Sequence, residues 1–184
     1  SFSNTTSANN TVVGYQAGYS NTTGGPITAM GYQAAYQGVT AEWTTAFGYQ
    51  AAANTTANFN SAFGRALVTN TSGSSNSAFG MNTLYYNTTG SNNTAFGAES
   101  LFSNTTASNN TAVGYQAGYF NQTGTSNSFV GRSAGYSNTT GSNNSFFGFE
   151  AGGINTGGNG ITAIGYQALA NHSVSGISNN TALG

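Results

Sequence analysis

Residues 110–117 form the run Asn110-Thr111-Ala112-Val113-Gly114-Tyr115-Gln116-Ala117, and variants of this run recur along the whole chain. Each copy has a Gly that follows a large apolar residue, with Thr or Ser two places further back. Eleven such glycines succeed one another at spacings of 17, 17, 16, 16, 17, 17, 17, 17, 17 and 19 residues. Self-similarity at a fixed period indicates a repeat architecture. We therefore predict one tandem-repeat domain over residues 1–184, as a segment of a longer array.

The residues of one period favour strands and turns over a helix. A Gly in every period, with many Asn, Thr and Ser residues, opposes helix formation. The block around each Gly alternates polar and apolar residues, as a short strand does. The block Asn87-Thr88-Thr89-Gly90 and its relatives have turn chemistry, because Asn and Gly tolerate the left-handed region. We predict two short strands and two bends per period, which makes an all-β fold, a β-solenoid (parallel β-roll) of about ten 17-residue coils.

Stacked coils would place equivalent residues in columns with a spacing of ~4.8 Å. We expect the large apolar column to give continuous contact inside the coil, and the Asn and Thr columns to form hydrogen-bond ladders. One coil of this size encloses a thin core, and exposed aromatic columns would be adhesive. We therefore expect side-by-side packing into a homotrimer or fibril, with the Ala and Gly columns allowing close approach of neighbouring chains.

Composition excludes several partners. The chain has two basic and three acidic residues and a formal net charge of −1, so it cannot neutralise a row of phosphates in nucleic acid. No apolar run approaches the ~20 residues of a membrane span, so no membrane insertion is expected. Cys is absent, which excludes disulfides and thiolate metal sites.

Two blocks carry a family resemblance. Residues 110–117 and the run 137–144 resemble the repeats of phage and marine-bacterial tail-fibre-like proteins. The step Ala163-Ile164-Gly165 is similar to one in the head repeats of trimeric autotransporter adhesins. The resemblance implies a trimeric, left-handed β-roll shaft that lies extracellularly, at a virion or cell surface. The longer period predicts a larger outer loop than in the adhesin heads.

No set of residues indicates an enzyme, a cofactor or a metal site. His172 is the only His and has no carboxylate near it in sequence, whereas a catalytic triad needs an acid that orients the base. Glu99 and Glu150 replace Gln in its column, three coils apart, and Arg65 and Arg132 replace Tyr in its column. Calcium-binding β-rolls need Asp in every loop, and this chain has none.

The leading hypothesis is a structural shaft of an extracellular fibre or adhesin. A row of tyrosines could add weak multivalent binding of cell-surface glycans, although we predict that this row mainly packs. The candidate glycan-stacking residues are Tyr15, Tyr32, Tyr49, Tyr115 and Tyr166.

The alternative hypothesis is a glycosylated extracellular fibril, a coat polymer. Fourteen Asn-x-Ser/Thr sequons occur, and we expect those of the loops to point outward. The loop candidates are Asn21, Asn54, Asn70, Asn87, Asn104, Asn121, Asn138 and Asn171, and the other sequons begin at Asn4, Asn9, Asn92, Asn109, Asn143 and Asn179.

Two weaker hypotheses concern the Thr/Ser column and one irregular coil. The strict Thr/Ser column resembles the hydroxyl arrays of ice-binding solenoids, which usually carry paired Thr residues on one strand. The coil over residues 37–45, with Glu42 beside Trp43, is the least regular and is a candidate for local recognition.

Overall fold

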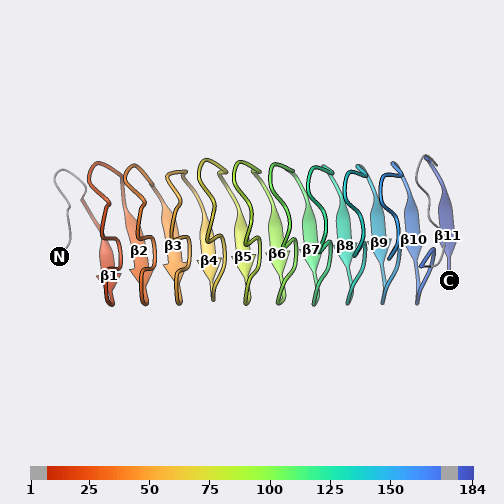
Figure 1. Cartoon of the computed structure of the whole chain (residues 1–184), viewed down its shortest axis with the longest axis horizontal. Coiled ribbons are helices and arrows are strands. Elements are labelled where there is room, and N and C mark those ends of the chain that lie inside the picture. The colour runs from red at the N-terminus through yellow and green to blue at the C-terminus, as the bar shows by residue number, and fades with distance from the viewer. Residues whose placement is uncertain (1–7, 171–177) are drawn as a thin grey trace.

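The computed structural model describes residues 8–170 and 178–184. Within these ranges the chain is all-β, without a helix. About ten coils follow one another along one axis in chain order (Figure 1). The predicted β-solenoid is confirmed.

Each coil contributes one short strand to a single parallel sheet, in which the order of the strands is their order in the sequence. The strands are β1 (Thr11–Val13), β2 (Ile27–Met30), β3 (Thr44–Phe47), β4 (Ser61–Phe63), β5 (Ser77–Phe79), β6 (Thr94–Phe96), β7 (Thr111–Val113), β8 (Ser128–Val130), β9 (Ser145–Phe147), β10 (Thr162–Ile164) and β11 (Thr181–Leu183). Pairing keeps the repeat in register, so that Ala95 lies beside Ala112 and Phe96 beside Val113. The columns inferred from the sequence are therefore columns in space.

The prediction of two strands per period is wrong, because each coil has one strand. Besides the Gly that follows the strand, most coils have three residues with positive φ, as at Glu99 (59°), Leu101 (49°) and Asn109 (63°). Left-handed residues interrupt extended backbone, and an L-residue in this region costs ~1–2 kcal/mol. The turns between the strands still form hydrogen bonds from coil to coil. For example, the main-chain N–H of Gln116 donates to the Ala98 carbonyl at 3.0 Å.

The large apolar column faces outward, which corrects the expectation that it lies inside the coil. Ala95, in the middle of β6, is fully buried, whereas Phe96 beside it is 42% exposed. Successive residues of a strand point to opposite faces, so a three-residue strand directs only its middle side chain inward. The middle position holds Ala in most coils, because the interior of a 17-residue coil is narrow.

The Ala and Gly columns make their close contacts within one chain. The Ala column is buried inside the coil, so the expected contact between chains through Ala is wrong. Gly48 has a φ of 131°, and a Cβ on this residue would lie 2.4 Å from the carbonyl oxygen of Gly64. Only Gly fits this place, because the next coil's backbone occupies the position of a Cβ.

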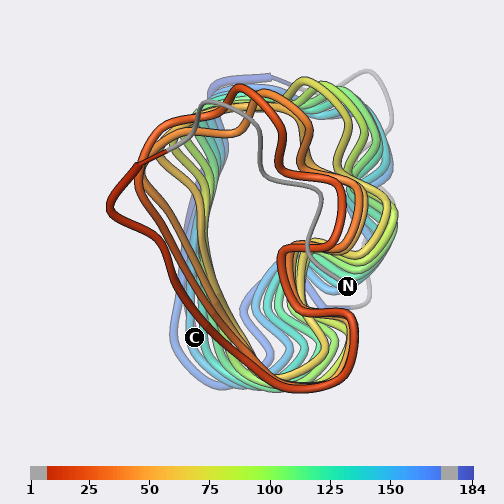
Figure 2. The ribbon, with the colours of Figure 1, turned by 90° about the vertical axis from the view of Figure 1, so that its left-hand side faces the viewer.

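Two ladders of buried Asn side chains hold the turns that lead back to the strand. In the first, Asn104 donates to the Asn87 side-chain oxygen at 2.7 Å and to the Ala107 carbonyl at 3.0 Å. In the second, the main-chain N–H of Asn110 donates to the Asn93 side-chain oxygen at 3.0 Å. The predicted Asn ladders are confirmed. Seen along the axis, the coils superpose on one cross-section whose outline is indented on one side (Figure 2).

Candidate functional site

Two columns of large side chains flank the stacked glycines on the outside of the rod, and we call them the glycine-flanking columns. The first precedes each Gly and comprises Val13, Met30, Phe47, Phe63, Phe79, Phe96, Val113, Val130, Phe147, Ile164 and Leu183. The second follows each Gly and comprises Tyr15, Tyr32, Tyr49, Arg65, Met81, Ala98, Tyr115, Arg132, Phe149 and Tyr166. Of the nineteen large apolar side chains exposed in the described ranges, seven lie in the first column and six in the second. Most exposed apolar surface thus forms one stripe along the rod.

The candidate glycan-stacking tyrosines all lie in the second column and are exposed, but they do not form one continuous row. Tyr15, Tyr32 and Tyr49 stack on one another, with ring centroids 5.3 and 5.2 Å apart. Both faces of the Tyr32 ring are therefore occupied by neighbouring rings, which favours the predicted packing role. Tyr166 stacks on Phe149 at 5.3 Å, and Tyr115 is separated from the other tyrosines.

Two of the three glutamates, Glu99 and Glu150, take part in the ladder of the Gln column. Gln33 donates to Gln16 at 3.0 Å, and the side chains of Gln116 and Gln167 donate in the same way to Glu99 and Glu150, both at 2.8 Å. A carboxylate accepts the bond that a Gln oxygen would accept. This supports the interpretation of both glutamates as Gln replacements.

The two arginines lie in the second flanking column, as expected, and make local contacts. Arg65 donates to Tyr85 Oη at 3.1 Å and lies over the Tyr85 ring at 4.8 Å. Arg132 lies over the Phe149 ring at 5.2 Å. Both arginines thus continue the side-chain packing of the columns.

The expectation that the loop sequons point outward is wrong for six of the eight candidates. Asn21, Asn70, Asn87, Asn104, Asn121 and Asn138 are fully buried. From Asn70 to Asn138 these side chains form the first Asn ladder, as where Asn121 donates to Asn104 at 3.1 Å and Asn138 to Asn121 at 2.8 Å. Folding therefore removes these nitrogens from any sugar donor. Asn54 is half-buried, and Asn171, like His172, lies outside the described residues.

Other sequons do face solvent. Their first residues are exposed and lie in the left-handed position before the strand, with φ of 58–63°: Asn9, Asn92, Asn109, Asn143 and Asn179. The sequence alone did not separate the two sets, because both repeat with the same period. The two sets differ in their place in the repeat. Each exposed sequon begins at the residue directly before an Asn of the second ladder, as Asn109 does before Asn110.

The irregular coil and the coil after it each expose one aromatic side chain. Trp43 and Phe59 occupy equivalent positions in successive coils and are 60% and 57% exposed. The Trp43 amide donates to the Pro26 carbonyl at 2.8 Å, which keeps this coil in the stack despite its sequence. No observation connects the pair to a ligand.

A second aromatic column lies five residues after the glycines. Tyr85, Phe102, Tyr119 and Tyr136 stack successively, with centroids 5.7, 5.0 and 5.2 Å apart. Burial raises the pKa of the Tyr119 phenol, and the carboxylate of Glu99 adds to this effect. The column ends at Tyr136, because the next coil has Gly153 in the equivalent place.

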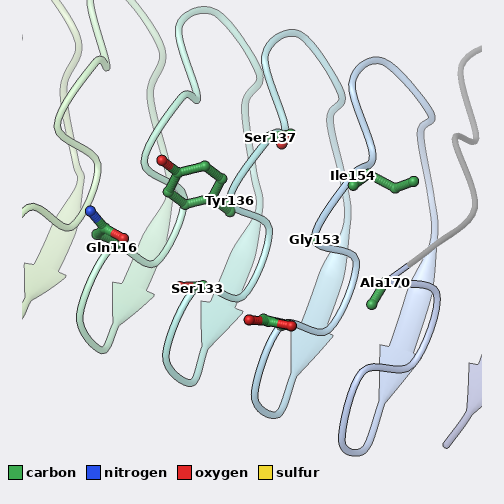
Figure 3. Close-up of a pocket in the computed structure, with 8 residues that line it drawn as sticks. Gln116, Ser133, Tyr136, Ser137, Gly153, Ile154 and Ala170 are labelled. Carbon is green, nitrogen blue, oxygen red and sulfur yellow. The ribbon is translucent and has the colours of Figure 1, made fainter.

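A groove of about 370 Å³ opens beyond Tyr136 (Figure 3). It is lined by Gln116, Ser133, Tyr136, Ser137, Glu150, Gly153, Ile154 and Ala170. Sequence reasoning missed this groove. Its signal in the sequence is Gly153, which stands where the preceding coils have an aromatic residue.

The described ranges contain no group of three or more His, Cys, Asp or Glu side chains that could hold a metal ion. Within the same ranges, no helix is long and apolar enough to cross a membrane. No protein-family model, no curated protein and no solved structure matches the chain significantly.

Proposed function

We propose that the chain is a structural shaft of an extracellular fibre or adhesin, in which copies pack side by side as a trimer. The stripe formed by the glycine-flanking columns carries this proposal. A monomeric soluble protein rarely exposes contiguous apolar patches larger than a few hundred Å², and larger patches mark interaction sites. Here the stripe runs from Val13 in β1 to Leu183 in β11.

The rod is built for stiffness along its axis. Successive coils are joined by strand pairing, and in the middle of the rod also by the two Asn ladders and by stacked rings such as Phe63 on Phe79 at 4.5 Å. Only five charged residues occur, so association would meet little like-charge repulsion and would depend weakly on salt. The three-fold arrangement and the virion or cell-surface location rest on the resemblance to tail-fibre-like and autotransporter repeats.

The alternative functions have less support. A glycosylated fibril would have to use the exposed sequons, such as Asn92 and Asn109, in place of the buried loop set. Ice binding is not favoured either, because the outer face of each strand pairs one hydroxyl with one large apolar residue, as in Thr111 and Val113.

The proposal is tested by the native mass of the chain before and after charges are placed on the stripe. We expect the wild type to have three times the chain mass of 18.6 kDa. The double variant Val113→Asp/Phe147→Asp puts charges at two positions that are 40% and 41% exposed, so it should dissociate without unfolding.

The matched control is Thr106→Asp/Thr123→Asp, which adds the same charges at exposed loop positions away from the stripe. This control should keep the wild-type mass. Equal masses for wild type and both variants would contradict association through the stripe, and far-ultraviolet circular dichroism checks that each variant is folded.

A further inference from the structure

The groove beside Tyr136 combines the face of an aromatic ring with convergent polar groups. Tyr119 covers one face of the Tyr136 ring at 5.2 Å. The other groove residues C-terminal to Ser137 belong to later coils, where Gly153 and Ala170 stand in place of aromatic residues. The second face of Tyr136 therefore has no stacked ring, Phe120 meets the ring in a T-shaped contact at 5.2 Å, and Tyr136 lines the groove (Figure 3).

The polar lining comes from two sides. Gln116, Ser133 and Glu150 belong to the Gln column of three successive coils, whereas Ser137 follows Tyr136 on the opposite side. The Gln116 side chain already donates to Glu99 and the Glu150 carboxylate accepts from Gln167, so both side chains are held in place. Their remaining acceptor and donor sites are available to a ligand.

We propose that this groove binds a neutral pyranose sugar, as a monosaccharide or a short oligosaccharide that lies along the rod. One face of the sugar packs on the second face of Tyr136, and the hydroxyls bond to Glu150, Gln116 and the two serines. Ligand sites typically combine apolar walls with a few placed polar groups in 300–1,000 Å³. Since Glu150 is the only carboxylate or cation in the lining, an anionic sugar gains no partner.

The site is distinct from the stripe. No groove residue belongs to a glycine-flanking column, so sugar binding and side-by-side association can succeed or fail separately. It also differs from the predicted Tyr row, in which neighbouring rings cover the faces of Tyr32.

The repeat itself supplies a blocking variant. Gly153→Tyr continues the aromatic column into the groove. The Gly153 amide donates to the Glu150 carbonyl at 3.1 Å, as that of Tyr136 donates to Ser133 at 3.2 Å, so both positions share one turn. A Cβ on Gly153 would meet only backbone atoms. The nearest is the main-chain carbonyl oxygen of Glu150 at 3.1 Å, which would have to move slightly.

The test uses saturation-transfer NMR and calorimetry with glucose, galactose, mannose and N-acetylglucosamine, and their disaccharides, as probes. We expect at least one of these sugars to bind the wild type, and Gly153→Tyr to abolish that binding. Tyr136→Ala should weaken binding about tenfold. Phe102→Ala is the control, because its ring lies within the same column between Tyr85 and Tyr119 and does not line the groove.

Three results would overturn the proposal: no binding of any of these sugars to the wild type, unchanged binding to Gly153→Tyr, or binding of tetramethylammonium in preference to every sugar. The native mass and circular dichroism of each variant are measured in parallel. A folded trimer that binds no sugar would refute this site and leave the shaft proposal intact.

Discussion

Two regions of the rod fill the same cross-section with different side chains. Around β4–β6 the strand contributes a buried Ala and the turn a buried Leu, as in Ala78 with Leu84. Around β8 and β9 the strand contributes Phe129 or Phe146, and the turn contributes Gly135 or Gly152. Both regions keep the same register and the same Asn ladders. The strand column and the turn column therefore share one core volume, which a large side chain from either column fills.

The glycines of the second region are required by the phenylalanine rings. A Cβ on Gly135 would lie 2.4 Å from Phe129 Cδ1, and a Cβ on Gly152 would lie 2.5 Å from Phe146 Cδ2. Where the strand residue is Ala, the same turn position accepts Leu, although its φ of about 50° costs ~1–2 kcal/mol. Burial of the leucine offsets this cost.

Truncation of the large core side chain should lower the free energy of unfolding more than any other change in each region. Phe129→Ala should cost about 4 kcal/mol and Leu84→Ala about 3 kcal/mol, because each leaves a cavity where neither column fills the core. Urea unfolding measures both free energies. A cost below about 1 kcal/mol for either variant would contradict the shared-volume account.

A side chain added to the filled core should destabilise the fold, and removal of the phenylalanine that fills it should relieve this effect. Gly135→Leu places a side chain where the Phe129 ring lies, and should cost about 3 kcal/mol from overpacking and left-handed backbone. The double variant Gly135→Leu/Phe129→Ala recreates the composition of the first region and should recover much of the loss. A double-mutant cycle measures the coupling, and simple additivity would show that the two columns are independent.

Loss of the shared ladder should have equal effects in the two regions. Asn87→Ala and Asn138→Ala each remove buried side-chain hydrogen bonds and should each cost about 2 kcal/mol. The exposed Thr106→Ala serves as the control and should change stability by less than about 0.5 kcal/mol. Unequal losses at the two buried positions would mean that the ladder depends on the core beneath it.

The smallest effect concerns Glu99, beside the aromatic column of the first region. Glu99→Gln should change stability by less than about 0.5 kcal/mol, because Gln116 can donate to either residue. It should lower the pKa of Tyr119, which nonetheless stays above its ordinary value because burial is the larger cause. Since the raised pKa favours the neutral phenol, this contribution to stability is complete below the unfolded pKa and is lost as pH rises through the folded pKa. Ultraviolet titration against Tyr119→Phe checks the shift, and an unchanged pKa would exclude the influence of Glu99.

The period of the sequence predicted the solenoid, its register and its Asn ladders, because stacking equivalent residues is the direct consequence of a constant repeat. It did not predict which face of the strand points inward. Thr94-Ala95-Phe96 alternates equally well in either phase, and hydrophobicity alone favours Phe96 inside. In this coil Leu101 from the turn already fills the core, so the small Ala95 points inward and Phe96 points outward.

The candidate sites were less predictable for the same reason. The loop sequons have turn composition, and turns are normally exposed, yet Asn87 points inward and donates to Asn70 of the preceding coil. The groove beside Tyr136 joins residues from four coils, so no single period contains it.

The native mass of the folded chain, from sedimentation equilibrium or native mass spectrometry, tests the central claim most directly. The account predicts an assembly of three chains of 18.6 kDa, held by the exposed stripe and reduced to single chains by Val113→Asp/Phe147→Asp. A folded monomer at all concentrations, with the stripe exposed to water, would contradict it.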